Sequence, residues 1–306
     1  MRRARFVSIN RAQVAAVATR LAGEPLHLPQ WDTALHFADG TARTANFVLV
    51  LDALNFSFWG EPRWRVTYRE RLLDGYWALA AALRRAIEEG VPLLEAGYLA
   101  SLTEPDLASI LRGEGEIPLP EQRLANLREV GRVLSAKYGG QFAAAIAAAQ
   151  RSAVQLVRRI VADFPSFADV ARYQRRAVRF YKRAQICVAD LYGAFGGQQW
   201  GHFADLDRLT AFADYKLPQI MRHYGMLEYS PALAERVDAA ITIPAGSPEE
   251  VEIRAGTIWA VEYLRQTLAE RGRPARAFEL DWYLWDLSQR EPGAMRPYHH
   301  TRTIFY

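Results

Sequence analysis

Three segments of the sequence place carboxylates among aromatic side chains more densely than a core requires: residues 49–60, 200–225 and 276–287. In the first, LVLDALNFSFWG, an apolar run takes in Asp52 and Asn55. Burying such a polar group without a hydrogen-bond partner costs about 1–3 kcal/mol by mutational estimates. Their presence therefore indicates partners in the folded protein, either backbone groups or a ligand.

The second segment offers three carboxylates in different settings. Asp205 suits the cap of a helix, and Asp207 would lie near the positive end of that helix. Asp214 falls inside the predicted helix, on its apolar side near Phe212, with Pro218 close behind. An aspartate on a helix usually faces solvent, but a proline bends a helix and frees backbone carbonyl groups, an irregularity common at working sites. We therefore expect Asp214 to belong to a site.

The third segment combines aspartates with tryptophans on a predicted helix. Asp281 and Trp285 are four residues apart and share one face, with Trp282 beside them and Asp286 five residues after Asp281. An indole ring can stack on a flat heterocycle while a carboxylate accepts hydrogen bonds from its N–H groups. Tryptophan packing in the core with a solvated aspartate fits the same pattern, so both interpretations stay open.

The composition is that of a folded protein of moderate positive charge. The 306 residues are 50% hydrophobic and 24% charged, with a formal net charge of +4. That charge is well below what a protein that coats nucleic acid carries, and it suits an anionic small molecule equally well. Cys187 is the single cysteine, which excludes an intrachain disulfide and favours a reducing compartment. We expect a cytoplasmic protein.

Several common functional motifs are missing from the sequence. No glycine-rich phosphate loop follows a predicted strand, and YGAFGGQQWGHF lacks the lysine and hydroxyl residue of a P-loop. The histidines form no HExxH motif, and the adjacent His299 and His300 would point to opposite faces of a strand, so we expect no metal. Cys187, between Ile186 and Val188, suits a buried structural thiol. Chemistry in this chain would therefore depend on carboxylates.

Helical periodicity dominates the chain and predicts a mainly α fold with a minor β ribbon. Asn10 caps a predicted helix that ends at Gly23, so the acid-free first segment is a helix rather than a targeting peptide. No apolar run approaches the roughly 20 residues of a membrane span. We expect one domain over residues 1–306, in one body or as two lobes with a cleft. Further helices are predicted at 69–90, 103–113, 120–138, 141–163, 173–194, 205–225, 247–272 and 276–287, and short strands at 34–50 and 302–306.

Taken together, VLDALNFSFWG, LTAFADYKLPQ and ELDWYLW resemble the queuosine-salvage family of queuosine 5′-phosphate N-glycosylase/hydrolases. The resemblance extends from the N-terminal helix to HTRTIFY. It implies hydrolysis of the bond between ribose and queuine in queuosine 5′-monophosphate, which releases the base for reinsertion into transfer RNA. It also implies a small-molecule substrate, no cofactor, and a fold similar to the helix-hairpin-helix DNA glycosylases.

The resemblance selects one carboxylate for catalysis. In those DNA glycosylases the catalytic aspartate follows a pattern near Val-Ala-Asp, and FAD at 212–214 matches it, which favours Asp214 over Asp205 and Asp207. No LPGVG hairpin with a preceding nucleophilic lysine is present, so monofunctional hydrolysis is expected. Queuine is a 7-deazaguanine and lacks the ring nitrogen that purine glycosidases protonate, so Asp214 would lie beneath C1′ and stabilise the sugar cation. Either Asp214 or a neighbour would deprotonate water.

The same resemblance suggests the remaining contacts. Asp281 would bind the guanine-like edge of the base, with Trp282 or Trp285 and Phe212 stacking on the ring. The 5′-phosphate would meet Lys216 or the basic C-terminal segment. The full set of expected substrate-binding residues is His27, Asp52, Asn55, Phe56, Phe212, Lys216, Asp281, Trp282, Trp285, Asp286, His300 and Arg302.

Two other functions compete with this one. A helix-hairpin-helix DNA glycosylase for damaged bases would need a basic stripe, against which the charge of +4 argues. A helical ligand-binding protein without catalysis would keep its function when Asp214 is changed to asparagine. We expect no stable nucleic-acid complex and no membrane association. The preference among nucleoside, 5′- and 3′-monophosphate, and the oligomeric state, stay open.

Overall fold

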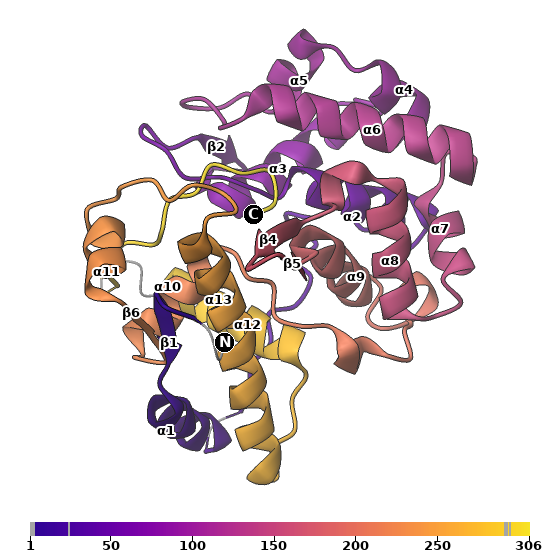
Figure 1. Ribbon diagram of the computed structural model, residues 1–306. Helices are drawn as coiled ribbons and strands as arrows, with labels where there is room; N and C mark the ends of the chain where they lie inside the picture. Colours follow the sequence, from indigo (N-terminus) through magenta and orange to yellow (C-terminus); the bar gives the residue numbers. More distant parts are fainter. Residues whose placement is uncertain (1–3, 24, 291–292, 294) are drawn as a thin grey trace.

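Helices with clear start signals form where the sequence predicts them. The computed structural model describes residues 4–23, 25–290, 293 and 295–306 (Figure 1). The Asn10 side chain caps α1 (Arg11–Ala22) by accepting from the backbone N–H of Gln13, and Ser247 caps α12 (Pro248–Glu270). Thr103 and Asp106 form a reciprocal capping box at α5 (Glu104–Ile110). The prediction of a mainly α fold is confirmed, whereas the likeness to helix-hairpin-helix enzymes stays a prediction.

Two of the segments predicted as helices contain part of a β-hairpin before the helix starts. The stretch 69–90 contains β3 (Arg71–Asp74), paired with β2 (Arg65–Tyr68), before α3 (Gly75–Glu88) starts. The stretch 173–194 likewise contains β5 (Arg176–Arg179), paired with β4 (Val170–Tyr173), before α9 (Lys182–Ala194). The turns between these strands adopt positive φ at non-glycine residues, so the turn signal on which we relied is missing from the sequence.

Three further expectations were wrong in detail. The predicted ribbon at 34–50 is mostly α2 (Ala42–Leu54), whose continuous apolar sequence reflects burial on all sides. The predicted helix 141–163 is two helices, α7 (Phe142–Ala148) and α8 (Ala153–Asp163), because Gln150 and Arg151 take positive φ between them. The C-terminal segment forms no strand within the described residues, although Tyr306 O accepts from the Ser57 backbone N–H at 2.9 Å.

The remaining elements complete two groups around separate buried apolar clusters. One cluster surrounds α2 with α3, α6 (Pro120–Tyr138), α7, α8 and α9, and the other joins α1 and α12 to α10 (Lys216–His223) and α13 (Ala277–Arg290). In Figure 1, α4, α5 and α6 lie at one end of the molecule and α1 lies far from them. The other elements are α4 (Ala96–Ser101), α11 (Pro231–Asp238), 3-10 turns at Pro165–Phe167, Gln199–Gly201 and Leu206–Arg208, and the antiparallel pair β1 (Val7–Ile9) and β6 (Leu227–Tyr229).

Among the residues that the structure describes, no helix combines the length and the apolar character needed to cross a bilayer.

Candidate active site

A cavity of about 340 Å³ opens between the two groups of helices and collects residues from both. Its volume falls at the lower end of the range typical of small-ligand pockets. Most of its aromatic lining comes from the loop before α2, the start of α3, the segment before α10, and α13. The lining includes Trp31, His36, Asn55, Phe56, Arg63, Asp74, Tyr76, Trp77, Lys182, Ile186, Asp190, Gly193, Phe212, Asp214, Tyr215, Lys216, Asp281, Trp282, Trp285, Tyr298 and Tyr306.

One face of α9 supplies a cation and a carboxylate to the cavity. Lys182, Ile186, Asp190 and Gly193 recur at helical spacing and all line it. Lys182 and Asp190 are both buried. Burial lowers the pKa of the Lys182 ammonium, while the Asp214 and Asp52 carboxylates oppose that change. Lys182 is therefore a buried cation whose charge is stabilised by carboxylates on other segments.

Asp214 is placed by the start of α10, not inside a helix as the sequence predicted. Its Oδ1 accepts hydrogen bonds from the backbone N–H groups of Lys216 and Leu217, each at 2.8 Å. Because α10 begins at Lys216, Pro218 lies in its first turn. An N–H in the first turn has no partner within the helix, so the proline breaks no hydrogen bond and does not bend the helix. Burial raises the pKa of the Asp214 carboxyl above its ordinary value, although the Lys182 charge and these two backbone hydrogen bonds oppose the rise. One carboxylate oxygen is thus fixed by backbone, and the side chain lines the cavity.

Asp281 approaches the same point from α13. Its Oδ2 accepts from the backbone N–H of Phe212 at 2.6 Å, which couples α13 to the segment that carries Asp214. Burial and the nearby Asp214 charge raise the pKa of the Asp281 carboxyl well above its ordinary value. The sequence left open whether Asp281 is solvated, and the structure decides this point because its exposed fraction is 5%.

Aromatic rings form the walls of the cavity around these charges. Tyr76 and Trp77 of α3 each meet Trp285 of α13 edge to face, with ring centroids 5.8 and 5.7 Å apart. A Cβ added to Gly193 would lie 3.6 Å from Trp282 and 3.9 Å from Trp31, so the backbone of α9 lies close to both indoles. Flat apolar walls with a few buried carboxylates are suited to a planar heterocycle that carries N–H donors.

Basic side chains gather near Asp214 at another part of the lining. Lys216 Nζ lies 5.1 Å from the centre of the Tyr298 ring, and Arg63 Nη1 contacts Asp74 Oδ2 at 3.0 Å. All four of these residues line the cavity. Burial lowers the pKa of the Lys216 ammonium, and the Asp214 carboxylate acts in the opposite direction. An anionic group bound at Lys216 would lie two residues along the chain from Asp214, the candidate catalytic carboxylate.

Two buried arginines fix the end of α2, where Asn55 and Phe56 enter the lining. Arg123 of α6 donates to the carbonyl oxygens of Leu54, Phe56 and Ser57, and Arg183 of α9 donates to those of Asp52 and Ala53. The carbonyl groups freed at the helix end are thereby satisfied without water. The two arginines thus bind the backbone of the 49–60 segment, whereas the Asp52 and Asn55 side chains bond each other, with Asn55 Nδ2 donating to Asp52 Oδ1 at 3.3 Å.

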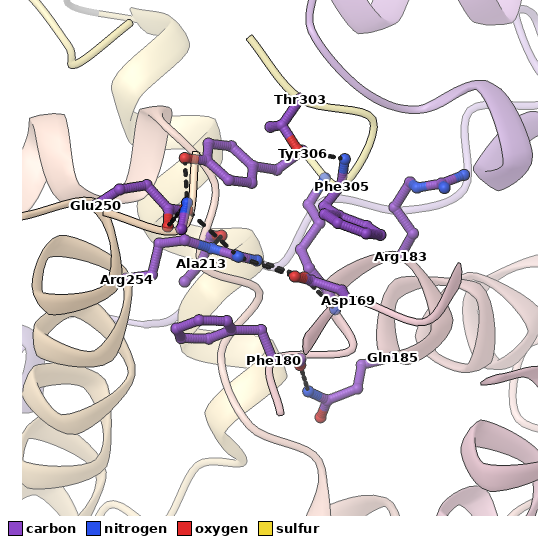
Figure 2. Close-up of polar contacts among 12 residues, drawn as sticks. Asp169, Phe180, Arg183, Gln185, Ala213, Glu250, Arg254, Thr303, Phe305 and Tyr306 are labelled. Atoms are coloured by element: carbon purple, nitrogen blue, oxygen red, sulfur yellow. Dashed lines mark hydrogen bonds and ion pairs between the residues drawn. The ribbon is translucent and has the colours of Figure 1, made fainter. Parts of the chain in front are cut away.

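A second set of buried charges, drawn in Figure 2, centres on Arg254, Asp169 and Glu250 and contacts residues next to the cavity. Arg254 of α12 forms a two-point ion pair with Asp169, and its Nε donates to Ala213 O at 3.1 Å. The Lys182 backbone N–H donates to Asp169 Oδ2 at 3.3 Å. Glu250 accepts from the Tyr306 hydroxyl at 2.9 Å. Arg254 therefore binds the backbone next to Asp214, and its partner Asp169 binds the backbone at Lys182. One ion pair thus positions both segments.

Eight of the predicted site residues line one cavity, and the others lie elsewhere. Asp52 is fully buried behind it and bonds Asn55, whereas Asp286 pairs with Arg290 along α13. His27 and Arg302 are exposed, and His300 stacks on Trp59 with 4.6 Å between ring centroids. The residues that the structure brings together as predicted are Asn55, Phe56, Phe212, Asp214, Lys216, Asp281, Trp282 and Trp285.

The two less favoured carboxylates of the second segment have other surroundings. Asp205 accepts from the Ser152 hydroxyl and the Ala153 backbone N–H, so it caps α8 from a distant part of the chain. Asp207 is exposed in a 3-10 turn. The sequence reasoning missed Lys182, Asp190 and Tyr76. Lys182 and Asp190 could have been found, because they recur with Ile186 at a four-residue spacing on one face of a predicted helix. Tyr76 carried no such signal, because it fits the apolar stripe of an ordinary core helix.

These features define a helical protein with a small, aromatic, carboxylate-lined cavity of the kind that binds a nucleobase-like ligand. Residues 35–306 match the family model described as queuosine salvage protein. The chain is 56% identical over 303 residues to a Sphaerobacter thermophilus protein named queuosine 5′-phosphate N-glycosylase/hydrolase, covering 99% of this chain and 94% of that one. Proteins of the same name from Bos taurus and Nematostella vectensis are 38% and 39% identical, covering 93% and 90% of this chain and 88% and 85% of theirs. The chain belongs to the queuosine salvage protein family.

Proposed function

We propose that this protein hydrolyses the N-glycosidic bond of queuosine 5′-monophosphate and releases queuine for salvage. The observation that carries the proposal is the meeting of Asp214, Asp281 and Lys182 in an aromatic cavity with basic residues beside it. The names of relatives up to 56% identical agree with it. We further propose that the free nucleotide is the substrate, in the cytoplasm and without a stable nucleic-acid complex.

Asp214 is proposed as the catalytic residue. With Oδ1 fixed by two backbone N–H groups, its carboxylate can face the sugar without changing rotamer. As the C1′–N bond breaks, positive charge develops on the ribose, and a carboxylate in a desolvated site stabilises that charge strongly. The water that attacks C1′ must lose a proton, which Asp214 accepts as the charge on the sugar is lost. The Lys182 charge acts against the rise that burial causes in the pKa of the Asp214 carboxyl.

The arrangement of charges suggests an orientation for the substrate. Asp281 would accept hydrogen bonds from the guanine-like edge of the base, between Trp282 or Trp285 and Phe212. The 5′-phosphate would then lie at Lys216 and Arg63, near Asp214. Lys216 and Asp214 are close in sequence, so one short segment would bind the phosphate and carry the catalytic carboxylate.

The test is a comparison of four compounds with purified protein: queuosine 5′-monophosphate, queuosine, guanosine 5′-monophosphate and a uracil-containing duplex. Free base is followed by chromatography with mass detection. We expect queuine from queuosine 5′-monophosphate, and a loss of at least about 1000-fold in kcat for Asp214→Asn with queuine binding retained.

Glu235→Gln is the matched control, since it makes the same carboxylate-to-amide change on the exposed side of α11. It should keep the wild-type rate. Base release from the duplex alone would replace this proposal by a DNA glycosylase. Tight binding of queuosine compounds without any turnover would establish a binding protein instead.

A further inference from the structure

Asp190 is the buried carboxylate of the cavity that the proposed reaction leaves unused. It lines the cavity from the middle of α9, and its exposed fraction is 8%. Within the described part of the chain, no group donates a hydrogen bond to it and no cation pairs with it directly. A buried carboxylate without a partner is costly, so a protein that keeps one in a cavity usually pairs it with a ligand.

The other two carboxylates of the cavity differ from Asp190 in this respect. Asp214 has two backbone donors at the start of α10, and Asp281 has the backbone N–H of Phe212. Lys182 is the buried cation beside all three in the described structure, and its charge is shared among them. Asp190 is therefore the one of these three carboxyl groups without a hydrogen-bond donor among the described residues.

The surroundings of Asp190 are aromatic. Tyr76 lines the same cavity as Asp190, and the Asp190 and Asp52 charges add to the rise that burial causes in the pKa of the Tyr76 phenol. Trp31 and Trp282 lie against Gly193, on the same face of α9 and one turn along. A carboxylate surrounded by aromatic faces is suited to an organic ammonium group, which gains from the ion pair and from cation–π attraction.

We propose that Asp190, with Tyr76, Trp31 and Trp282 around it, is a subsite for the secondary ammonium group of the queuine side chain. This inference rests on the proposed function, because that function supplies the ligand. Queuine differs from 7-deazaguanine by an aminomethyl arm whose nitrogen bears the cyclopentenediol, and a secondary alkylamine of this kind is protonated at neutral pH. Asp190 accepts a hydrogen bond from that N–H, and the rings cover the apolar carbons on either side. The subsite selects queuosine 5′-monophosphate over guanosine 5′-monophosphate.

The direct test measures binding of the free bases by calorimetry, so it does not depend on turnover. Wild type should bind queuine more tightly than 7-deazaguanine, which lacks the ammonium arm. In Asp190→Asn the preference for queuine should fall by about 10- to 100-fold, the range expected on losing a charge-assisted hydrogen bond. Affinity for 7-deazaguanine should change by less than about threefold, which also shows that the variant is folded.

Kinetics separate this inference from the proposed function. If wild type releases no queuine from queuosine 5′-monophosphate, the proposed function fails whatever the binding data show. If wild type releases queuine and Asp190→Asn keeps the full preference for queuine over 7-deazaguanine, the subsite is wrong and the function stands. The supporting result is a KM raised about 10-fold or more with kcat within about threefold of wild type, since Asp190 contacts the arm and not the reacting bond.

Discussion

Two clusters of buried charge lie close together in this protein and are built in opposite ways. In the cluster behind the cavity, Arg254 bonds both oxygens of Asp169, and Glu250 has Tyr306 and Gly246 as donors. In the cavity, Lys182 is shared among three carboxylates, and Asp190 has no donor among the described residues.

The charges of the first cluster are paired within the protein and stabilise the fold. The carboxylates of the cavity have fewer partners within the protein and can bind groups of a ligand. Burial lowers the pKa of the Arg254 guanidinium, but the adjoining Asp169 carboxylate outweighs burial and raises that pKa above its ordinary value. Burial instead raises the pKa of the Asp190 carboxyl, and the Asp52 charge adds to the rise. A fully paired cluster gains nothing from a ligand, whereas an underpaired one gains from each cation or donor that a ligand brings.

Breaking the paired cluster should have the largest effect. Arg254→Met leaves Asp169 and Glu250 without their cation and frees the Ala213 carbonyl, so we expect a loss of about 3–5 kcal/mol in the free energy of unfolding. Urea denaturation followed by circular dichroism measures it. Arg265→Met is the matched control on the same helix, because Arg265 pairs with Glu262 near the surface and should cost less than about 1 kcal/mol. Equal losses in the two variants would contradict the distinction.

Asp52 provides an intermediate case, since it is fully buried beside the cavity and its Oδ2 has no partner among the described residues. Burial raises the pKa of its carboxyl from 3.8 to about 7. The folded state therefore holds this proton more tightly than the unfolded chain, and stability is lost as the pH rises from about 4 to 7. Asp52→Asn has no such proton to lose, so its stability should not fall in this way. The unfolding free energy of Asp52→Asn minus that of wild type should therefore be about 3 kcal/mol larger at pH 8 than at pH 5.

Thermal and urea unfolding of the two proteins at both pH values measures this gain. A difference between Asp52→Asn and wild type that is the same at pH 5 and pH 8 would contradict the prediction.

Removing the Lys182 charge should change the pH dependence of catalysis. The Lys182 charge acts against burial to hold down the pKa of Asp214, so Lys182→Met should raise that pKa. Because Asp214 must be ionised in the proposed reaction, the acid limb of the kcat/KM profile should then move to higher pH. Lys182→Arg keeps a positive charge at this position and should leave the limb near its original pH. A Lys182→Met profile that falls in height without moving would assign the lysine a structural role only.

The smallest effect is expected at the basic edge of the cavity. Lys216→Gln should raise KM for queuosine 5′-monophosphate about fivefold, because the side chain is half-buried and Arg63 keeps part of the positive charge. The KM for the nucleoside queuosine should stay the same. Lys137→Gln is the control, since Lys137 pairs with Asp163 on the surface. Equal rises in KM for nucleotide and nucleoside would show that Lys216 does not bind the 5′-phosphate.

The sequence was informative wherever a local rule decides the structure. Asn10, Thr103 and Ser247 mark helix starts through their own side chains, and the structure has the helices there. The hairpins at β2–β3 and β4–β5 were missed because their turns use arginine, glutamate and glutamine at positive φ, where sequence rules expect glycine or asparagine. The apolar run of α2 was ambiguous, because a segment buried on all sides has no periodicity to show.

The candidate site was predictable to the extent that its residues cluster in the chain. Asp214, Lys216 and Phe212 fall within five positions, and Asp281, Trp282 and Trp285 lie on one short helix. Asp190 and Tyr76 acquire their meaning only because α9, α3 and α13 all contribute residues to one cavity, which no local pattern records. The paired cluster was invisible for the same reason, since Asp169 and Arg254 are 85 residues apart.

The cavity lining begins at Pro29 and ends at Tyr306, so its walls come from both early and late parts of the polypeptide. During translation, a ribosome that has passed Asp214 has made the proposed catalytic carboxylate but not yet Asp281, Trp285 or Tyr298. Such a nascent chain lacks α13, and with it Asp281 and the indole rings of Trp282 and Trp285 that line the cavity. We therefore expect chains released before α13 is made to be inert toward the cell's nucleotides.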